Sequence, residues 1–481
     1  MSSSKQVVTR FAPSPTGTLH IGGLRTALYS YLMAKASGGK FILRIEDTDR
    51  TRYVEESVGD IIDSLKWAGL NWDEGPIYQS ERLGEYKKYA DKLLESGKAY
   101  RCFCSAERLT ELRDKQKENK EDIGYDGKCR VLSDEEISTK VENGESFTIR
   151  LKLPESGVIK VGDLVRGEIE YNYENLEDLV IVKTDGFPTY HLAHVVDDSL
   201  MGVTHVFRGT EWIPTSPMHA FMFDALSLER IQYVHLPLIL SPEGGKLSKR
   251  HGATSVKEFI KLGYTKEGLL NFLSLLGWSL DDKTEDFTLE DLEKVFDPKR
   301  ISKSASTFSY DKLNYFNGKY IKSFSDEKLF DLIKPFLIEL TGEAKFEEEK
   351  ERLQKIVSLY KDRLVTLSEI GPYIKFFFDD SMLPTSADQF VFKKMSQEDV
   401  VKGLEIALSI SEKLPSWDLS LYNEQVKVKT KEAGLKMHHV FMPLRMAVTG
   451  TAQTPSISDL VILLGKEESE KRLKKSLELL K

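Results

Sequence analysis

The feature that most constrains this chain is a strand that runs through a proline- and glycine-containing turn into a helix. Residues 7–11 are rich in β-branched and aromatic side chains, as expected of a buried strand. Apolar residues then recur at helical spacing from Leu24 to Leu32. A second such unit follows, with a strand at 41–45 and a helix around 54–68. Alternating strands and helices predict a parallel sheet, whose ligands bind at the carboxyl ends of its strands.

The rest of the chain changes character twice. Residues 99–186 carry short strands, turns and all three cysteines, which predicts an insertion into the sheet domain. The strand–helix pattern returns at 187–240. Beyond residue 267 the apolar residues recur mainly at helical spacing, which predicts a helical C-terminal third. A length of 481 residues suggests about three domains at roughly 150 residues each.

The composition limits the cellular compartment and the kinds of binding partner that we expect. No apolar run reaches the roughly 18 residues of a membrane span, and no secretion signal is evident near residue 1. Three cysteines, an odd number, agree with a reducing compartment rather than a disulfide framework. We therefore expect a globular cytoplasmic protein. Because the net charge is −8, any contact with nucleic acid must come from local basic patches.

Two segments have the composition of phosphate-binding sites. His20, Gly22 and Gly23 lie at a predicted helix start, where free backbone N–H groups and the helix dipole favour anions. An ordinary helix start after a glycine-containing turn is the open alternative. The second segment, 244–252, is a glycine-bounded loop with four potentially cationic side chains, although solvated surface has the same composition. The chain lacks the P-loop and Gly-x-Gly-x-x-Gly motifs, which disfavours ordinary NTPases and dinucleotide-binding proteins.

Charged residues also stand at the ends of predicted strands. Arg10 and Arg208 can form charge-assisted pairs with a ligand carboxylate, and Glu46 can bind an ammonium group. The alternative for Arg10 or Glu46 taken singly is a surface ion pair worth roughly 0–1 kcal/mol. The Asp197–Asp198 pair fits a structural or helix-capping role better than a metal site.

A basic stretch interrupts the acidic composition at residues 294–322. It holds seven Lys or Arg against two Asp, a local charge of +5, and it is interleaved with tyrosine and phenylalanine. This combination suits a phosphate backbone and stacked bases. A solvated face over a local core is the alternative.

The cysteines leave a metal site open. Cys102, Cys104 and Cys129 offer three soft ligands, whereas zinc prefers four. Three reduced, partly buried thiols are the alternative.

Several motifs taken together resemble one family. In chain order they are residues 7–17 (VVTRFAPSPTG), 20–23 (HIGG), 44–49 (RIEDTD), 190–198 (YHLAHVVDD), 246–250 (KLSKR), 317–321 (NGKYI) and 443–445 (PLR). Over the whole chain they are similar to the bacterial glutamyl-tRNA synthetases, which are class I aminoacyl-tRNA synthetases. The chain departs from the HIGH signature at Gly23, where a histidine is usual.

The resemblance implies an α/β Rossmann-like class I synthetase catalytic domain with an α+β insertion, followed by an all-α C-terminal anticodon-binding region. The implied boundaries are 1–98 and 187–240 for the catalytic domain, 99–186 for the insertion, 241–322 for the KLSKR loop and stem-contact domain, and 323–375 and 376–481 for two helical anticodon-binding modules. The implied reaction is the ATP-dependent ligation of L-glutamate to tRNA(Glu) through a glutamyl-adenylate, with Mg²⁺ on the phosphates and AMP and diphosphate released. A monomer is expected.

The resemblance also assigns roles to residues of this chain. Catalysis falls to His20, Lys246 and Lys249. ATP binding falls to His20, Gly22, Gly23, Lys246, Ser248, Lys249 and Arg250. Glutamate binding falls to Arg10, Ala12, Ser14, Glu46, Tyr190, His194 and Arg208. Contacts to tRNA fall to Lys299, Arg300, Lys303, Lys319 and Arg363. A structural zinc would be held by Cys102, Cys104 and Cys129 with Tyr125, because Tyr-x-x-x-Cys resembles a paralogous family that glutamylates a tRNA base.

Other functions stay open at this point. A small-molecule nucleotidylyltransferase shares the helix start but is usually far shorter. The tRNA-base glutamylating paralogue typically lacks a helical region like 323–481, and a non-catalytic RNA-binding protein does not need Lys246 and Lys249. A non-discriminating synthetase that also charges tRNA(Gln) requires no additional motif.

Overall fold

The structure is a computed structural model that describes residues 6–245, 247, 250 and 252–481. The chain divides into two compact units. Unit 1 comprises Met1–Phe259 and Leu269–Tyr310, and unit 2 comprises Ile260–Gly268 and Asp311–Lys481. The predicted six-part division is finer than this and stays a prediction. Lys246, Ser248 and Lys249 lie outside the described residues.

The framework of unit 1 is a seven-stranded sheet with the order β3-β2-β1-β9-β10-β6-β7. Its strands are β1 (Val8–Phe11), β2 (Lys40–Ile45), β3 (Glu74–Tyr78), β6 (Val158–Asp163), β7 (Gly167–Asn172), β9 (His205–Gly209) and β10 (Gln232–Leu236). All neighbours are parallel except β6 and β7. Because β1 lies between β2 and β9, the strand order reverses there. Ligands of such sheets bind at the carboxyl ends of strands at this reversal.

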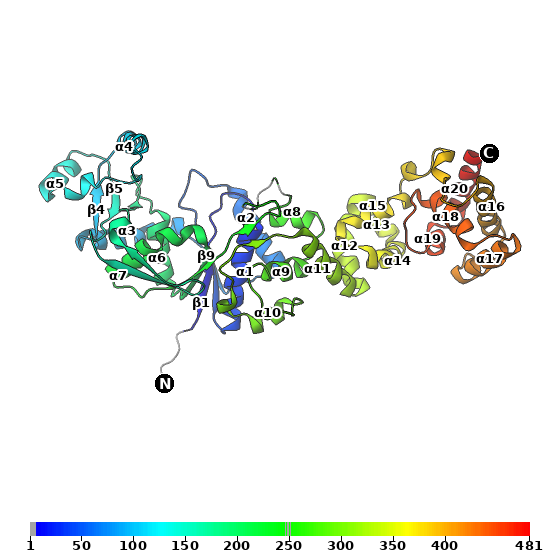
Figure 1. The fold of residues 1–481 in the computed structure, drawn as a ribbon, viewed down its shortest axis with the longest axis horizontal. Helices are drawn as coiled ribbons and strands as arrows, with labels where there is room; N and C mark the ends of the chain where they lie inside the picture. The colour runs from blue at the N-terminus through cyan, green and yellow to red at the C-terminus, as the bar shows by residue number, and fades with distance from the viewer. Residues whose placement is uncertain (1–5, 246, 248–249, 251) are drawn as a thin grey trace. The chain divides into compact units, whose positions relative to one another are not determined.

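Helices cover the sheet on both faces. Those of unit 1 outside the insertion are α1 (Ile21–Ala36), α2 (Glu55–Ala68), α3 (Leu83–Glu95), α6 (Tyr190–Leu200), α7 (Ser216–Ala225) and α10 (Leu289–Val295), while α8 (Val256–Lys261) and α9 (Lys266–Ser274) span the boundary between the units. Helices α3, α6 and α7 lie next to one another (Figure 1). Their apolar sides form one buried cluster with the strands, which includes Leu93, Val195 and Met222. Strand β1 is buried along its whole length, as expected of a strand covered on both faces.

Residues 99–186 contribute to two sheets. Their own three-stranded antiparallel sheet has the order β4-β5-β8 and consists of β4 (Ala99–Cys102), β5 (Thr148–Leu151) and β8 (Val180–Val182). Two helices, α4 (Ala106–Asn119) and α5 (Asp134–Glu142), belong to the same segment. The β6–β7 hairpin instead extends the main sheet beyond β10. The segment is therefore built partly into the main sheet of unit 1.

Unit 2 is helical, as the sequence predicts. Its helices are α11 (Tyr310–Ser323), α12 (Asp326–Thr341), α13 (Glu343–Glu348), α14 (Lys350–Tyr360), α15 (Ile370–Ile374), α16 (Gln397–Lys413), α17 (Leu419–Glu432), α18 (Met437–Thr449), α19 (Ile457–Leu464) and α20 (Lys466–Leu480). Leu329, Ile333 and Leu337 of α12 are fully buried at a spacing of four residues, which confirms the predicted apolar face. Within the described part of the chain, no helix combines the length and apolarity needed to cross a bilayer.

Candidate active site

The start of α1 is built around the side chain of its N-cap residue, His20. The Nδ1 atom of His20 accepts a hydrogen bond from the Gly23 backbone N–H at 3.0 Å. A ring nitrogen that accepts carries no proton, so the neutral imidazole carries its proton on Nε2, which is a donor. A Cβ at Gly22 would lie 3.1 Å from this ring, which explains why the turn uses glycine. The helix start therefore combines backbone N–H groups with an imidazole donor.

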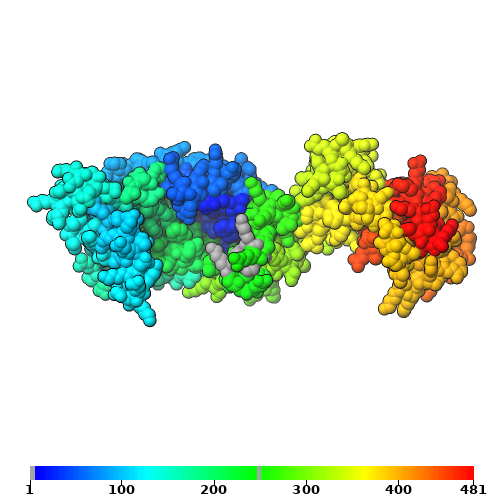
Figure 2. Space-filling model, turned by 90° about the horizontal axis from the view of Figure 1, so that it is seen from above, coloured from blue at the N-terminus to red at the C-terminus, as the bar shows by residue number. Residues whose placement is uncertain are grey.

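The chain that follows the cationic loop pairs with this helix start. The Ile21 N–H donates to the Thr254 carbonyl at 2.9 Å, and the Val256 N–H donates to the Leu19 carbonyl at 2.9 Å. In the space-filling view, surface from the start of the chain (blue) adjoins surface from the middle of the chain (green) (Figure 2). Arg250 is exposed in the loop. The two predicted phosphate-binding segments thus belong to one region of unit 1.

A buried network of charges lies near the end of β1. Arg10 donates from Nε to both carboxylate oxygens of Asp198, at 3.3 and 3.2 Å. The fully buried Arg44 donates to Asp198 at 2.6 Å and to Glu46 at 3.2 Å. Burial alone would raise the pKa of Asp198, but Arg10 and Arg44 hold it well below its usual range. Asp198 is therefore ionised and fixes both guanidinium groups.

The Asp197–Asp198 pair lies inside α6 and does not cap a helix. Asp197 accepts hydrogen bonds from Gln79 at 2.8 Å, from Arg82 at 2.8 Å and from Tyr86 at 2.7 Å. Both carboxylates are thus saturated by protein donors, in agreement with the structural role preferred over a metal site.

Arg208 has a different environment from Arg10. It is 5% exposed. Its hydrogen-bond partners are His235 Nε2 at 3.0 Å, Tyr190 Oη at 3.3 Å, His219 Nδ1 at 3.3 Å and the Trp212 carbonyl at 3.4 Å. All of these acceptors are uncharged, and no carboxylate of the described residues forms an ion pair with Arg208. A buried charge without a counter-charge is costly, so this arrangement is suited to an anionic ligand.

Aromatic stacking holds the Tyr190 ring beside Arg208. The ring stacks on His194 with centroids 5.4 Å apart and an interplanar angle of 2°, and it contacts Trp212 at 4.1 Å. His194 is fully buried, with Nδ1 2.7 Å from Asp198 and Nε2 3.1 Å from the Tyr233 hydroxyl. Burial lowers the pKa of His194 to about 3, so this imidazole is neutral near pH 7. His194 therefore connects the Arg10 network to the Tyr190 ring.

The loop after β1 lies beside Glu46, which directly follows β2. The Glu46 N–H donates to the Pro13 carbonyl at 3.0 Å. Ala12 and Ser14 flank that carbonyl, Ala12 partly buried and Ser14 exposed. Burial raises the pKa of Glu46, although Arg44 and Arg10 oppose the shift. The residues predicted to bind glutamate are thus grouped at the carboxyl ends of β1, β2 and β9 and at the start of α6.

Three groups around Arg208 were not predicted from the sequence: Asp163, His219 and His235. His235 Nδ1 lies 2.6 Å from Asp163 Oδ2, and all three side chains are buried. A histidine within the apolar run 232–240 was the one available signal for His235. Asp163 comes from the predicted insertion, and only the pairing of β6 with β10 reveals its position.

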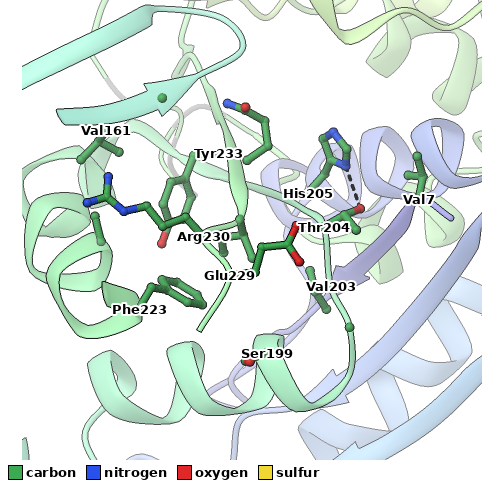
Figure 3. Close-up of a pocket in the computed structure, with 15 residues that line it drawn as sticks. Val7, Val161, Ser199, Val203, Thr204, His205, Phe223, Glu229, Arg230 and Tyr233 are labelled. Carbon is green, nitrogen blue, oxygen red and sulfur yellow. Dashed lines mark hydrogen bonds between the residues drawn. The ribbon is translucent and has the colours of Figure 1, made fainter. Parts of the chain in front are cut away.

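A cavity of about 530 Å³ lies elsewhere, at the amino ends of β1, β9 and β10 (Figure 3). Thr204, His205, Glu229 and Arg230 are among the residues that line it, and His205 Nδ1 lies 2.8 Å from Thr204 Oγ1. Among the residues that the structure describes, those predicted to bind ATP or glutamate do not line this cavity. The cavity is therefore not the predicted substrate site, although Tyr233, which packs against Arg208, also lines it.

The cysteines converge as a metal site requires. The Sγ atoms of Cys102, Cys104 and Cys129 lie within 4.8 Å of one another. The Tyr125 hydroxyl is 3.4 Å from Cys102 Sγ and 3.7 Å from Cys104 Sγ. Tetrahedral zinc–sulfur bonds of about 2.3 Å place ligand atoms roughly 3.8 Å apart, so this group of four has suitable dimensions.

The predicted tRNA-contact residues are divided between the units. Lys299, Arg300 and Lys303 are exposed in unit 1. Lys319 is exposed in unit 2, with its ammonium 6.0 Å from the centre of the Tyr315 ring. The basic stretch 294–322 therefore does not form a patch within one unit.

Arg363 has a basic neighbour that the sequence did not reveal. Arg363 donates to the Thr454 carbonyl at 2.9 Å, and Arg445 donates from Nε to the Thr454 hydroxyl at 2.9 Å. Burial and the nearby Arg363 lower the pKa of Arg445. Two guanidinium groups side by side favour an anionic or hydrogen-bond-accepting partner.

The sheet with its reversal between β1 and β9, the phosphate-type helix start and the helical second unit define a class I aminoacyl-tRNA synthetase. Residues 6–315 match the family described as "tRNA synthetases class I (E and Q), catalytic domain", and residues 328–477 match "Anticodon binding domain". The chain is 43% identical to the glutamate–tRNA ligase of Treponema denticola over 98% of this chain and 99% of the relative. It is 42% identical to the Clostridioides difficile enzyme of the same name, over 97% and 98%.

Solved structures agree. A glutamate tRNA ligase from Elizabethkingia meningosepticum, in complex with its amino acid, matches with a TM-score of 0.87 and 35% identity over 99% of this chain and 100% of that chain. The chain belongs to the glutamate–tRNA ligase family of class I synthetases.

Proposed function

We propose that the chain ligates L-glutamate to tRNA(Glu) in two ATP-dependent steps, through a glutamyl-adenylate, and releases AMP and diphosphate. The observation that carries the proposal is the buried Arg208, whose hydrogen-bond partners in the described residues are all uncharged. This charge is suited to a ligand carboxylate at the edge of the sheet where class I synthetases work. The names of relatives that match almost the whole chain point to the same amino acid.

The glutamate pocket uses both arginines. Arg208 and Arg10 bind the side-chain carboxylate, with a hydroxyl hydrogen bond from Tyr190. Glu46 binds the substrate ammonium group. His194 acts through the stacked Tyr190 ring, and Ala12 and Ser14 form the adjoining wall. Glutamine is disfavoured because its amide replaces a charged acceptor and presents N–H groups to the guanidinium donors.

Adenylate formation needs no general base. The α-carboxylate of glutamate is already ionised, and it attacks the α-phosphate of ATP while diphosphate leaves. The protein contributes position and positive charge: Nε2–H of His20, the α1 backbone at Gly22 and Gly23, and the cationic loop. The loop residues are Lys246, Ser248, Lys249 and Arg250. Mg²⁺ bound with ATP would supply further positive charge for the phosphates.

Transfer to tRNA follows the same principle. A ribose hydroxyl of the terminal adenosine attacks the carbonyl of the adenylate, and AMP leaves, its phosphate taking up the hydroxyl proton. Because AMP is a good leaving group, the chain needs no nucleophile of its own. Catalysis consists of holding the two reactants in line.

Contacts to tRNA come from both units of a monomer. Lys299, Arg300, Lys303 and Lys319 contact the phosphate backbone. Arg363, with Arg445 beside it, reads the anticodon. Replacing Arg363 with Ala lowers kcat/KM for tRNA by roughly 10-fold or more while leaving the KM for glutamate unchanged. Lys402→Ala, which alters an exposed lysine of α16, is the matched control.

Zinc, if bound, is held by the cluster of Cys102, Cys104, Cys129 and Tyr125. The fit rests on the spacing of the four ligand atoms and on the soft thiolate donors. The ion supplies bracing for residues 99–186 and takes no part in the reaction, since the cluster lies outside the ATP-binding segments.

The direct test follows both products in one reaction. Purified protein is mixed with glutamate, tRNA(Glu) and ATP labelled at the α-phosphate. We expect labelled AMP to form in step with glutamate on tRNA. Formation of ADP, or no glutamate on tRNA while the protein is folded, contradicts the proposal.

A further inference from the structure

Arg208 is the end of a line of three buried side chains that come from three different strands. Asp163 ends β6, His235 lies on β10 and Arg208 lies on β9. His235 and Arg208 are register partners in adjacent parallel strands. His235 Nδ1 is 2.6 Å from Asp163 Oδ2, and Arg208 Nε donates to His235 Nε2 at 3.0 Å. Each of the three side chains is 5% exposed or less.

The groups at the two ends of this line determine which ring nitrogen of His235 carries the proton. A guanidinium can only donate, so His235 Nε2 is the acceptor and carries no proton. The proton of the neutral ring is therefore on Nδ1, where it is donated to the Asp163 carboxylate. Asp163 is itself held by the N–H groups of Val165 at 2.8 Å and Arg166 at 2.7 Å. The carboxylate thus sets the tautomer that can accept from Arg208.

His219 is a second neutral imidazole that accepts a hydrogen bond from the Arg208 guanidinium. Its Nδ1 lies 3.3 Å from Arg208 Nη1 and accepts, so its Nε2 carries the proton and donates to His191 Nδ1 at 2.9 Å. The Tyr233 ring lies 4.2 Å below the guanidinium carbon and stacks on His235. Arg208 is therefore held in place by acceptors and rings that leave its charge intact.

Arg10 offers the internal contrast. It is held directly by the Asp198 carboxylate, which offsets its charge. Arg208, in contrast, is separated from the Asp163 carboxylate by the neutral imidazole of His235. An intervening neutral group fixes the position of an arginine without neutralising it, which is what a site needs to prefer a carboxylate over an amide.

We propose that His235, oriented by Asp163, is the positioning residue of Arg208 and sets the preference of the site for a carboxylate side chain over an amide. The proposal rests on the proposed function, because it takes glutamate as the ligand of Arg208. His235 itself does not need to touch the substrate.

The test uses the full-length protein and four variants. His235→Ala removes the acceptor, whereas His235→Gln keeps an amide oxygen that can accept from Arg208. Asp163→Asn removes the charge that sets the tautomer. His205→Gln is the matched control, since this partly buried histidine lies at the other end of β9 and bonds to Thr204. Charging of tRNA(Glu) gives KM and kcat for glutamate and for glutamine, and circular dichroism monitors folding.

We expect His235→Ala to raise the KM for glutamate about 10- to 100-fold, because a buried donor loses its partner. Its kcat should stay within about threefold, since His235 contacts no reacting atom. The ratio of kcat/KM for glutamate over glutamine should fall about tenfold or more. Asp163→Asn should show a smaller rise in KM, and His235→Gln should stay within about fivefold of the wild type.

Several results overturn the proposal. One is a folded His235→Ala with the wild-type KM and the wild-type preference for glutamate. Another is His235→Gln being as impaired as His235→Ala, or His205→Gln being equally impaired. If His235→Ala does not fold, Asp163→Asn decides: a folded Asp163→Asn with the wild-type KM and the wild-type preference for glutamate overturns the proposal. A wild-type protein that charges no glutamate at all overturns the proposed function itself, whereas the results above overturn only this inference.

Discussion

Asp198 of α6 accepts two hydrogen bonds from Nε of Arg10 on β1, at 3.3 and 3.2 Å. The same carboxylate binds the fully buried Arg44 at 2.6 Å. Removing its charge with Asp198→Asn leaves Arg10 without its carboxylate partner and leaves Arg44 with Glu46 and Asp197 as its counter-charges. We expect the free energy of unfolding to fall by about 3–5 kcal/mol, measured by denaturant titration. Asp91→Asn, which alters an exposed pair with Lys87, should cost about 0–1 kcal/mol.

The ion pairs of Asp198 should also make the stability of the protein depend on pH in acid. The pKa of Asp198 is well below its usual range in the folded protein, because Arg10 and Arg44 outweigh the effect of burial. The stability that this shift provides is present above the unfolded pKa near 3.9 and is lost as pH falls toward the folded pKa. Stability measured below about pH 4 should therefore fall less steeply for Asp198→Asn than for the wild type. Equal slopes for the two proteins contradict this role.

The cationic loop should act in the transition state. We expect Lys246→Ala and Lys249→Ala each to lower the single-turnover rate of glutamyl transfer roughly 10²- to 10³-fold, the scale of losing one preorganised donor. Glutamate binding should change little. Lys261→Ala, at the exposed end of α8, serves as the control. Rates within about threefold of wild type for both loop variants would remove the loop from the ATP chemistry.

Arg208 should decide affinity for glutamate. Arg208→Ala removes the buried charge on which the proposed pocket depends, so calorimetry should show much weaker glutamate binding. Arg10→Ala should weaken it as well, and it also leaves Asp198 with one cation fewer. If Arg208→Ala binds glutamate as tightly as the wild type, the pocket lies elsewhere.

Metal analysis tests the cysteine cluster. Protein purified without added metal should contain about one zinc per chain, and Cys104→Ser should lower that content. Chelation should loosen residues 99–186 and weaken the use of tRNA while ATP binding stays near normal. Well under half an equivalent of zinc, with three freely titratable thiols, would identify the cysteines as packing residues.

Much of the site could be predicted because its residues follow strands that the sequence marks clearly. Arg10 and Glu46 come at the ends of apolar runs, and parallel strands bring such ends to one edge. The helical region was predictable from apolar spacing, as the buried face of α12 confirms.

What the sequence could not show is pairing between distant segments. The β6–β7 hairpin alternates buried and exposed residues, which fits any sheet, and only its pairing with β10 brings Asp163 to His235. A structural role for Asp198 was predicted, but its partners could not be predicted for a similar reason. In the sequence, a carboxylate within a helix fits an exposed position as well as a buried one. Only the structure shows that Arg10 and Arg44, from two different strands, face Asp198.

The central claim is tested most directly by offering purified tRNA(Glu) and tRNA(Gln) each with glutamate and with glutamine. The account predicts ATP-dependent attachment of glutamate to tRNA(Glu) and no attachment of glutamine to either tRNA. Glutamate on tRNA(Gln) as well would identify a non-discriminating form with the same amino-acid pocket. Glutamine attached as efficiently as glutamate, or tRNA(Glu) left uncharged by a folded and ATP-binding protein, would contradict the account.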